Sequence, residues 1–288
     1  MLPKNDGGGG TKLHCSGSIL NEKTVLTAAH CFFGEFPEDE TKMTVIVGAN
    51  EPTNPKSLIK RRRFIQQKKI DNVKIHPLYD KKLYSAKYDM ALIQIKGEFN
   101  FRESIWPICI PEKIAEREEH FDLGYILLGY GKNTNEMDKG EVLSSETLIV
   151  QPSQACSATY DEILKFPNHK KHAIVKQTLP QNFNDDSLLC ANVPGTISGS
   201  CRGDSGGILM KVDWIDDLPV PDYRAVQKAV LHGAPFNCDG ERFPPIFTRI
   251  DKHEALSWIK ENAFPGLQVH TYIRSGKMIF FCFQIQNA

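Results

Sequence analysis

The chain has 288 residues, enough to bury the core of one large domain or of two closely packed units. Lysine plus arginine and aspartate plus glutamate are balanced at 35 each, so net charge does not point to nucleic acid or an anionic membrane as a partner. The apolar fraction is 41%, with 17 prolines and 21 glycines, which suits short strands joined by many turns and predicts an all-β fold.

Short apolar runs bounded by turn residues predict strands along the chain. In chain order they are residues 25–27, 43–47, 70–76, 90–95, 126–128, 147–150, 208–212 and 229–231. Residues 50–55 are rich in proline and asparagine and predict a loop. Residues 252–263 predict an amphipathic helix with Leu256 and Ile259 facing inward. The later apolar run 278–283 is too short to cross a bilayer, so no membrane partner is expected.

The eight cysteines form no CxxC pair, which argues against a zinc or thioredoxin-like site and favours disulfides. Disulfides persist mainly outside the cytosol, so the sequence predicts a secreted protein. The chain itself carries no basic segment followed by an apolar one, and therefore no signal peptide is expected within it. His169 and His172 surround two lysines, which disfavour a cation, so no metal site is expected there.

Three polar residues in distinct sequence contexts suggest acyl-transfer chemistry. A serine hydroxyl is a poor nucleophile until a base takes its proton, and a histidine oriented by a carboxylate can do so near neutral pH. Ser205 lies in Gly203-Asp-Ser205-Gly-Gly207, His30 follows two alanines, and Asp89 precedes a strand. The N–H groups of Gly203 and Ser205 would form an oxyanion hole for the developing negative charge.

The residues around Ser205 also fit the G-x-S-x-G nucleophile elbow of α/β-hydrolases. That alternative requires a helix after the serine and an acid and a histidine further along the chain, and the histidines at positions 232, 253 and 270 satisfy the order. However, residues 208–212 are predicted as a strand, and no βαβ alternation surrounds them. The elbow is therefore the disfavoured interpretation.

Several segments together resemble the trypsin/chymotrypsin-type serine peptidases. They are HCSGSIL, TAAHC, YDMALIQI, PICIP, GDSGG and ALSWIKENA, and the resemblance runs from about residue 13 to about residue 264. It implies two packed antiparallel β-barrels with a C-terminal α-helix, and a catalytic triad of His30, Asp89 and Ser205 at their junction. The implied boundaries are a peptidase domain over 1–264, with barrels at about 13–112 and 120–251 and a helix at 252–263, and an extension of unknown role over 265–288.

The same resemblance implies a disulfide pattern. The implied bridges are Cys15 with Cys31, Cys156 with Cys190, and Cys201 with Cys238. Cys109 and Cys282 are left over. Many family members have a cysteine at the position of Cys109 that bridges to a pro-segment or light chain, so such a partner is expected, whereas the resemblance implies no partner for Cys282.

Asp204 is the residue that the resemblance links to activation. In the family, zymogen cleavage creates an α-amino group that pairs with this carboxylate, and no Ile-Val-Gly-Gly-like sequence precedes His30 here. A buried carboxylate without an ammonium partner is unfavourable. We therefore expect Asp204 to turn outward or find another donor, and the chain alone to be zymogen-like, truncated at its N-terminus.

The floor of the substrate pocket departs from the trypsin pattern. The resemblance places Gly199 where an aspartate would select arginine or lysine, with Ser200 beside it. Small or medium apolar residues are therefore the expected preference at the cleavage site. Asp239 and Glu241 remain alternative acids if their loop folds inward.

The expected pocket wall also departs from the family. Leu231, His232 and Gly233 stand where Ser-Trp-Gly is usual, and Pro245 stands where a glycine would open the pocket. Loss of the serine predicts loss of a hydrogen bond to the catalytic carboxylate, and the proline ring would narrow the pocket.

Two functions follow as hypotheses. The first is a serine endopeptidase that hydrolyses protein or peptide substrates through an acyl-enzyme. The second is a non-catalytic serine-protease homologue that acts by binding a partner. Neither requires a cofactor or metal.

Overall fold

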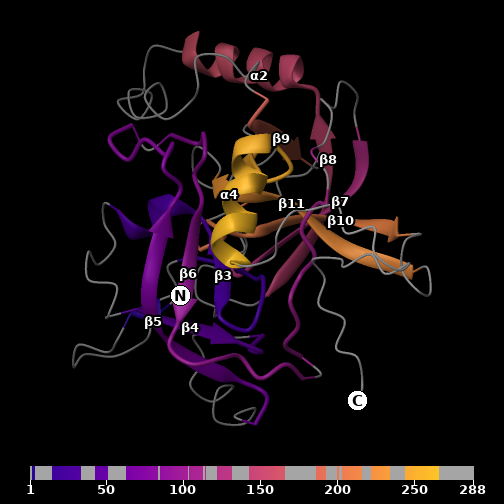
Figure 1. The fold of residues 1–288 in the computed structure, drawn as a ribbon. Helices are drawn as coiled ribbons and strands as arrows, with labels where there is room; N and C mark the ends of the chain where they lie inside the picture. The colour runs from indigo at the N-terminus through magenta and orange to yellow at the C-terminus, as the bar shows by residue number, and fades with distance from the viewer. Residues whose placement is uncertain are drawn as a thin grey trace, which may run out of the picture.

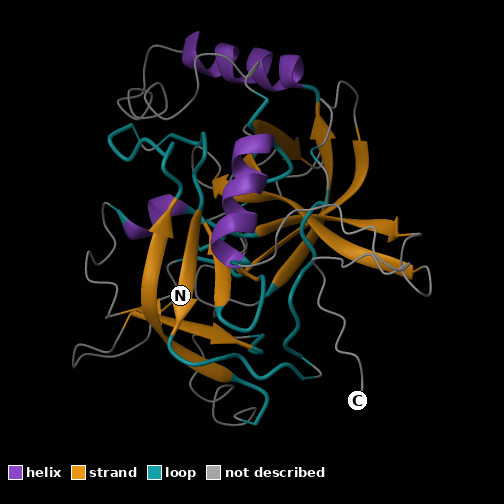
Figure 2. Cartoon of the chain, viewed as in Figure 1, coloured by secondary structure: helices purple, strands orange, loops and turns teal. Residues whose placement is uncertain are grey.

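The computed structural model describes a part of the chain that includes the segments around His30, Asp89 and Ser205. The described residues are 2–3, 15–33, 43–50, 63–83, 85–102, 104–112, 114, 122–131, 143–165, 186–192, 200, 203–215, 222–233 and 244–265. Two β-sheet bodies make up this part of the molecule, and two α-helices accompany them (Figures 1 and 2).

The first body is a curled six-stranded antiparallel sheet formed by the N-terminal part of the chain. Its strands, in spatial order, are β1 (Leu2–Pro3), β4 (Met43–Val47), β5 (Gln66–Ile75), β6 (Ala91–Ile95), β3 (Thr24–Thr27) and β2 (Ser18–Ile19). Strand β4 alternates buried and half-buried residues, as a strand with one face on the core does. Strands β3 and β6 are almost entirely buried and form the centre of this core.

The second body is a closed six-stranded antiparallel barrel. Its strands, in spatial order, are β10 (Ile208–Ile215), β11 (Asp222–Gly233), β12 (Ile246–Arg249), β9 (Leu188–Asn192), β8 (Ser144–Gln151) and β7 (Asp122–Gly129). Closure leaves no unpaired sheet edge. The interior is filled by large side chains, among them Tyr125, Leu209, Leu231 and Phe247.

The predicted fold class is confirmed, and each of the eight predicted strands overlaps an observed one. Strands β1, β2, β9 and β12 and helix α2 (Ser153–Lys165) were not predicted. Strand β12 has the sequence Ile-Phe-Thr-Arg, and its polar residues Thr248 and Arg249 are buried, so it does not show the apolar run that marks the predicted strands. Strand β10 directly follows the Ser205 turn, so the helix that a nucleophile elbow requires is absent at this position and that alternative is excluded.

Helix α4 (His253–Ala263) joins the two bodies, because it follows the last barrel strand but packs on the first core. Leu256 and Ile259 are buried in that core, as the sequence predicted. The last turn is held by Asn21, whose side-chain amide donates to the carbonyl of Ala263 at 2.7 Å. The helix therefore fixes the first core against the end of the second barrel.

Two disulfides are found among the described residues, Cys15–Cys31 and Cys156–Cys190. The second ties helix α2 to strand β9. Cys109 is also disulfide-bonded, and its partner lies outside the described residues. That partner is a cysteine of this chain, because the structure contains no other chain, so the expected bridge from Cys109 to a pro-segment or light chain is corrected. Cys201, Cys238 and Cys282 lie outside the described residues, so the third implied bridge stays a prediction.

Candidate active site

Asp89 is presented by a strained turn at the start of strand β6. Tyr88 has φ of +54°, the left-handed region that a bulky side chain rarely adopts. The Tyr88 ring stacks on His76 with ring centroids 4.8 Å apart and planes 4° apart, which holds the turn in place. As a result the Asp89 carboxylate lies fully buried, at 0% exposure.

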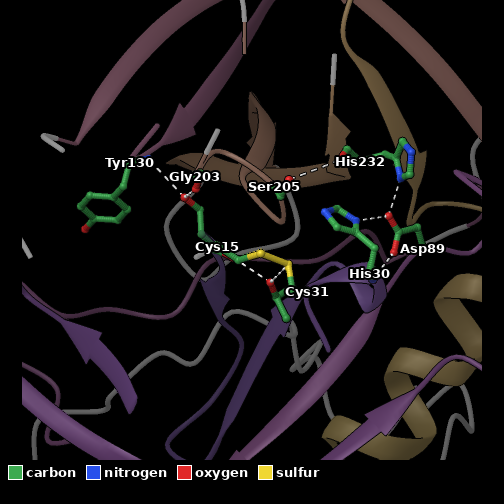
Figure 3. The surroundings of a disulfide bond; sticks show 10 residues. Cys15, His30, Cys31, Asp89, Tyr130, Gly203, Ser205 and His232 are labelled. Atoms are coloured by element: carbon green, nitrogen blue, oxygen red, sulfur yellow. Dashed lines mark hydrogen bonds and ion pairs between the residues drawn. A yellow bond between two sulfur atoms is a disulfide. The ribbon is translucent and has the colours of Figure 1, made fainter. Parts of the chain in front are cut away.

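His30 lies on a short 3-10 helix, η1 (Ala29–Phe32), and Asp89 contacts it twice. The His30 backbone N–H donates to Asp89 Oδ1 at 2.8 Å, and His30 Nδ1 lies 2.6 Å from Oδ2. The neighbouring Cys31 is bridged to Cys15, which fixes the same turn covalently (Figure 3). Orientation of this imidazole is therefore set by three separate restraints.

Ser205 lies in a tight turn that contacts the first body. The turn is closed by the Gly207 N–H, which donates to the Asp204 carbonyl at 2.7 Å. Gly206 has φ of +80°, and a Cβ there would lie 2.2 Å from Thr27 Oγ1, so only glycine fits. This close approach brings Ser205, from the second barrel, to the side of the His30 ring that faces away from Asp89 (Figure 3).

The resting hydroxyl of Ser205 does not bond to His30 in the described structure. Its Oγ donates instead to the carbonyl oxygen of His232, at 3.5 Å. Within the described part of the chain, the N–H groups of Gly203 and Ser205 donate no hydrogen bond. Both donors are therefore available to an incoming oxyanion.

Ser16 buttresses this turn, a role that sequence reasoning missed. Its hydroxyl donates to the Gly203 carbonyl at 2.9 Å and accepts from the Tyr130 N–H at 3.1 Å. Its own N–H donates to the Ser205 carbonyl at 2.8 Å. The hydroxyl and its Gly203 acceptor are 187 positions apart in the sequence, so no local pattern could have indicated the contact.

Asp204 stays inside the protein, at 7% exposure, rather than turning outward. Its Oδ1 accepts the N–H of Gly131 at 2.6 Å. Burial, together with the nearby charge of Asp204, raises the pKa of Glu146. Asp204 was expected either to turn outward or to find another donor, and it finds the backbone N–H of Gly131.

Replacing Gly131 with alanine is expected to expel the Asp204 carboxylate. A Cβ at position 131 would lie 2.0 Å from Asp204 Oδ2 and 2.3 Å from Cγ. We expect a loss of about 3 kcal/mol in unfolding free energy, as for other buried charges that lose a partner. Denaturant unfolding measures it. Gly97→Ala, where φ is +78° and the space is open, should cost only about 1–2 kcal/mol. Equal losses in the two variants would contradict the steric account.

His232 is the main unexpected feature of the site. Its Nδ1 lies 2.5 Å from Asp89 Oδ2, the same oxygen that contacts His30, and the two imidazole rings meet edge to face with centroids 5.3 Å apart (Figure 3). The predicted loss of a hydrogen bond to this carboxylate is therefore wrong. The sequence resemblance placed the residue that would bond the Asp89 carboxylate at position 231, whereas position 232 makes the bond.

Leu231 is also corrected as a pocket-wall residue. Successive side chains of a strand point to opposite faces, so when His232 faces Asp89, Leu231 points into the barrel. It is 0% exposed and packs in the second core with Phe247. Only its backbone reaches the serine turn, through hydrogen bonds with Gly206 and Gly207.

The charge state of Asp89 follows from its surroundings. Burial alone would raise its pKa, but the charges and hydrogen bonds of His30 and His232 outweigh burial and hold the pKa below its usual range. An ionised carboxylate only accepts hydrogen bonds, so both Nδ1 atoms carry protons. In the neutral form of an imidazole, a proton on Nδ1 leaves a lone pair on Nε2, which is what a general base at His30 requires.

The remaining predicted pocket residues are only partly described. Ser200 is 3% exposed, and its hydroxyl has no hydrogen-bond partner among the described residues. Pro245 is buried, and its carbonyl accepts from Ala191 at 3.3 Å. Gly233 pairs with Ile246 at the end of strand β11. Gly199, Asp239 and Glu241 lie outside the described residues, so the pocket floor stays a prediction.

Among the described residues, no helix has the length and apolar character needed to cross a membrane.

Comparison with known proteins agrees with this geometry. The chain is 27% identical over 256 residues to the clotting factor G beta subunit of Tachypleus tridentatus, covering 87% of this chain and 71% of that protein. It is 27% identical to melanization protease 1 of Drosophila melanogaster, covering 86% and 58%. It is 24% identical to trypsin-1 of Astacus astacus, covering 86% and 87%. The family model described as Trypsin matches residues 4–259, and the chain therefore belongs to the trypsin family of serine proteases.

Proposed function

We propose that this chain is a serine endopeptidase in which Ser205 is the nucleophile, His30 the general base and Asp89 the group that orients His30. The observation that carries the proposal is the doubly bonded Asp89–His30 pair, with Nδ1 to Oδ2 at 2.6 Å. Beside it lies the serine turn, in which the N–H groups of Gly203 and Ser205 donate no hydrogen bond to a described residue. These are the parts that acyl transfer needs.

Each chemical step has a group in place. Ser205 Oγ attacks the substrate carbonyl carbon while its proton passes to His30 Nε2. The negative charge that forms on the carbonyl oxygen accepts hydrogen bonds from the N–H groups of Gly203 and Ser205. His30 then returns the proton to the leaving amine, and a water activated in the same way releases the acyl group. The Ser205–His30 hydrogen bond forms on substrate binding, as catalytic hydrogen bonds often tighten only then.

The proposal also covers the compartment in which the protein acts, its substrates and its synthesis as a zymogen. The described disulfides support a secreted protein, since such bonds persist outside the cytosol. The substrates are proteins or peptides with a small or medium apolar residue at the cleavage site. Asp204 is buried. In the family that the sequence resembles, the carboxylate at this position pairs with the α-amino group that zymogen cleavage creates, so Asp204 supports synthesis as a zymogen.

Labelling with a fluorophosphonate probe tests the function, because the probe reacts only with an activated serine. The purified chain is incubated with the probe, and the labelled residue is located by peptide mass spectrometry. The sequence predicts zymogen-like behaviour for this chain, but Asp204 is already buried on the Gly131 N–H, so we expect modification of Ser205 together with cleavage of a mixed peptide library. Absence of both would favour the second function, a non-catalytic homologue. That alternative is supported by the bond of Ser205 Oγ to the His232 carbonyl rather than to His30.

A further inference from the structure

Two histidines converge on one carboxylate in this site, and the mechanism above uses only one of them. One ligand-capable atom from each of His30, Asp89 and His232 lies within 4.8 Å of the other two. The other such group in the described chain contains Cys15 and Cys31, whose sulfurs form a disulfide and offer no thiolate. The His30, Asp89 and His232 cluster, here called the two-histidine site, is thus the better candidate for a metal.

We propose that the two-histidine site binds Zn²⁺ and that the bound ion switches off the catalytic histidine. This inference rests on the proposed function and names a form of its regulation. The donor set is two imidazole nitrogens and one carboxylate oxygen, which is a known set for three-ligand zinc sites that keep a fourth position open. Imidazole donors favour zinc and similar transition metals over Mg²⁺ or Ca²⁺.

The present distances require only a small rearrangement. The two N···O separations are 2.5 and 2.6 Å, because protons and not a metal lie between the atoms now. Tetrahedral zinc with bonds of about 2.0–2.2 Å would set neighbouring ligand atoms about 3.3 Å apart. The histidines come from separate elements, η1 and strand β11, so their rings can move apart independently. Their side chains are 15% and 16% exposed, which gives an ion a route of entry.

The proton position explains why zinc would inhibit. A neutral imidazole carries one ring proton, and in the metal-free site that proton is on Nδ1. Zinc bound to Nδ1 displaces the proton, which moves to Nε2, with no net proton lost. The Nε2 atom then presents an N–H to Ser205 instead of a lone pair. His30 can no longer accept the serine proton, so the nucleophile stays unactivated.

His232 supplies the third protein ligand of the two-histidine site. Without it, zinc would have only His30 and the carboxylate of Asp89 as protein ligands. Substitution by serine keeps a small hydroxyl donor for Asp89 but removes the nitrogen ligand. Loss of even an outer-shell partner costs about 10–100-fold in metal affinity, so we expect His232→Ser to weaken zinc binding by at least about tenfold.

Calorimetric titration with Zn²⁺ tests the site independently of catalysis. The titration uses Ser205→Ala, which keeps all three ligands and has no nucleophile. One ion per chain is expected, with weaker binding when His232→Ser or His232→Asn is added. The matched control is His253→Ser, at an exposed histidine on helix α4, which should leave the affinity unchanged. Circular dichroism of each variant confirms folding. Equal zinc affinity with and without His232 would overturn the proposal, as would absence of binding.

Fluorophosphonate labelling of the chain with an intact Ser205 tests the switch. Zinc should slow labelling, a chelator should restore it, and Mg²⁺ should have no effect. Zinc binding through His232 without any slowing would overturn the inhibitory role. If the metal-free chain is not labelled at all, the proposed peptidase function fails, and the calorimetric titration still decides whether the two-histidine site binds zinc.

Discussion

Replacement of Ser205 by alanine is expected to lower kcat for peptide hydrolysis by about a million-fold, the size of effect seen when a triad nucleophile is removed. The reason is that the acyl-enzyme cannot form without the Ser205 hydroxyl that would attack the substrate carbonyl. KM should change little, because the hydroxyl contributes mainly to the transition state. Steady-state kinetics on a peptide substrate measure both quantities.

The matched control for this change is Ser145→Ala, at an exposed serine of strand β8 far along the chain from the serine turn. It should retain the kinetics of the unmodified chain. Equal activity in Ser205→Ala and the unmodified chain would show that the hydrolysis comes from a different nucleophile or from another protease in the sample.

Asp89→Asn is expected to lower kcat by about ten-thousand-fold, as the same change does in a triad of this kind. An amide at position 89 can donate a hydrogen bond, so His30 is no longer held with its proton on Nδ1. Here the change has a second consequence, because His232 loses the same anionic acceptor. Single-turnover kinetics at neutral pH measure the loss. Asp71→Asn, at an exposed position of strand β5, is the control and should have no effect.

The same variant reports on acid stability. The pKa of Asp89 is held below its usual range in the folded protein, so this group stabilises the fold when it is ionised. The stabilisation is complete above the ordinary unfolded value of about 3.9 and is lost as the pH falls toward the lower folded value. The unmodified chain should therefore lose more unfolding free energy on acidification than Asp89→Asn. Parallel pH profiles would show that the carboxylate does not favour the folded state.

The fold was largely predictable from local patterns. Short apolar runs between turn residues located eight of the twelve described strands, and the spacing of Leu256 and Ile259 located the closing helix. Strands β1 and β2 escaped prediction because two residues are too few to show a pattern. Strand β12 escaped because its second half, Thr248 and Arg249, is polar although it is buried.

The candidate site was predictable only in part. His30, Asp89 and Ser205 lie in sequence contexts with chemical reasons of their own, such as the glycines that the serine turn requires, so they were found without a structure. Ser16 and His232 were not found in their roles, because a serine and a histidine in strand-like sequence have many possible uses. The residues that they contact lie 187 and 143 positions away.

The sequence by itself therefore determined the all-β fold class, because apolar runs and turn chemistry act between near neighbours, and its resemblance to the trypsin/chymotrypsin-type peptidases indicated the residues of the proposed chemistry. Only the tertiary structure decided that Asp204 stays buried on the Gly131 N–H and that Leu231 belongs to the core. It alone also placed a second histidine on Asp89. These outcomes depend on which face of each strand turns toward the other sheet body. A shift of one residue along strand β11 would place Leu231 instead of His232 at the Asp89 carboxylate.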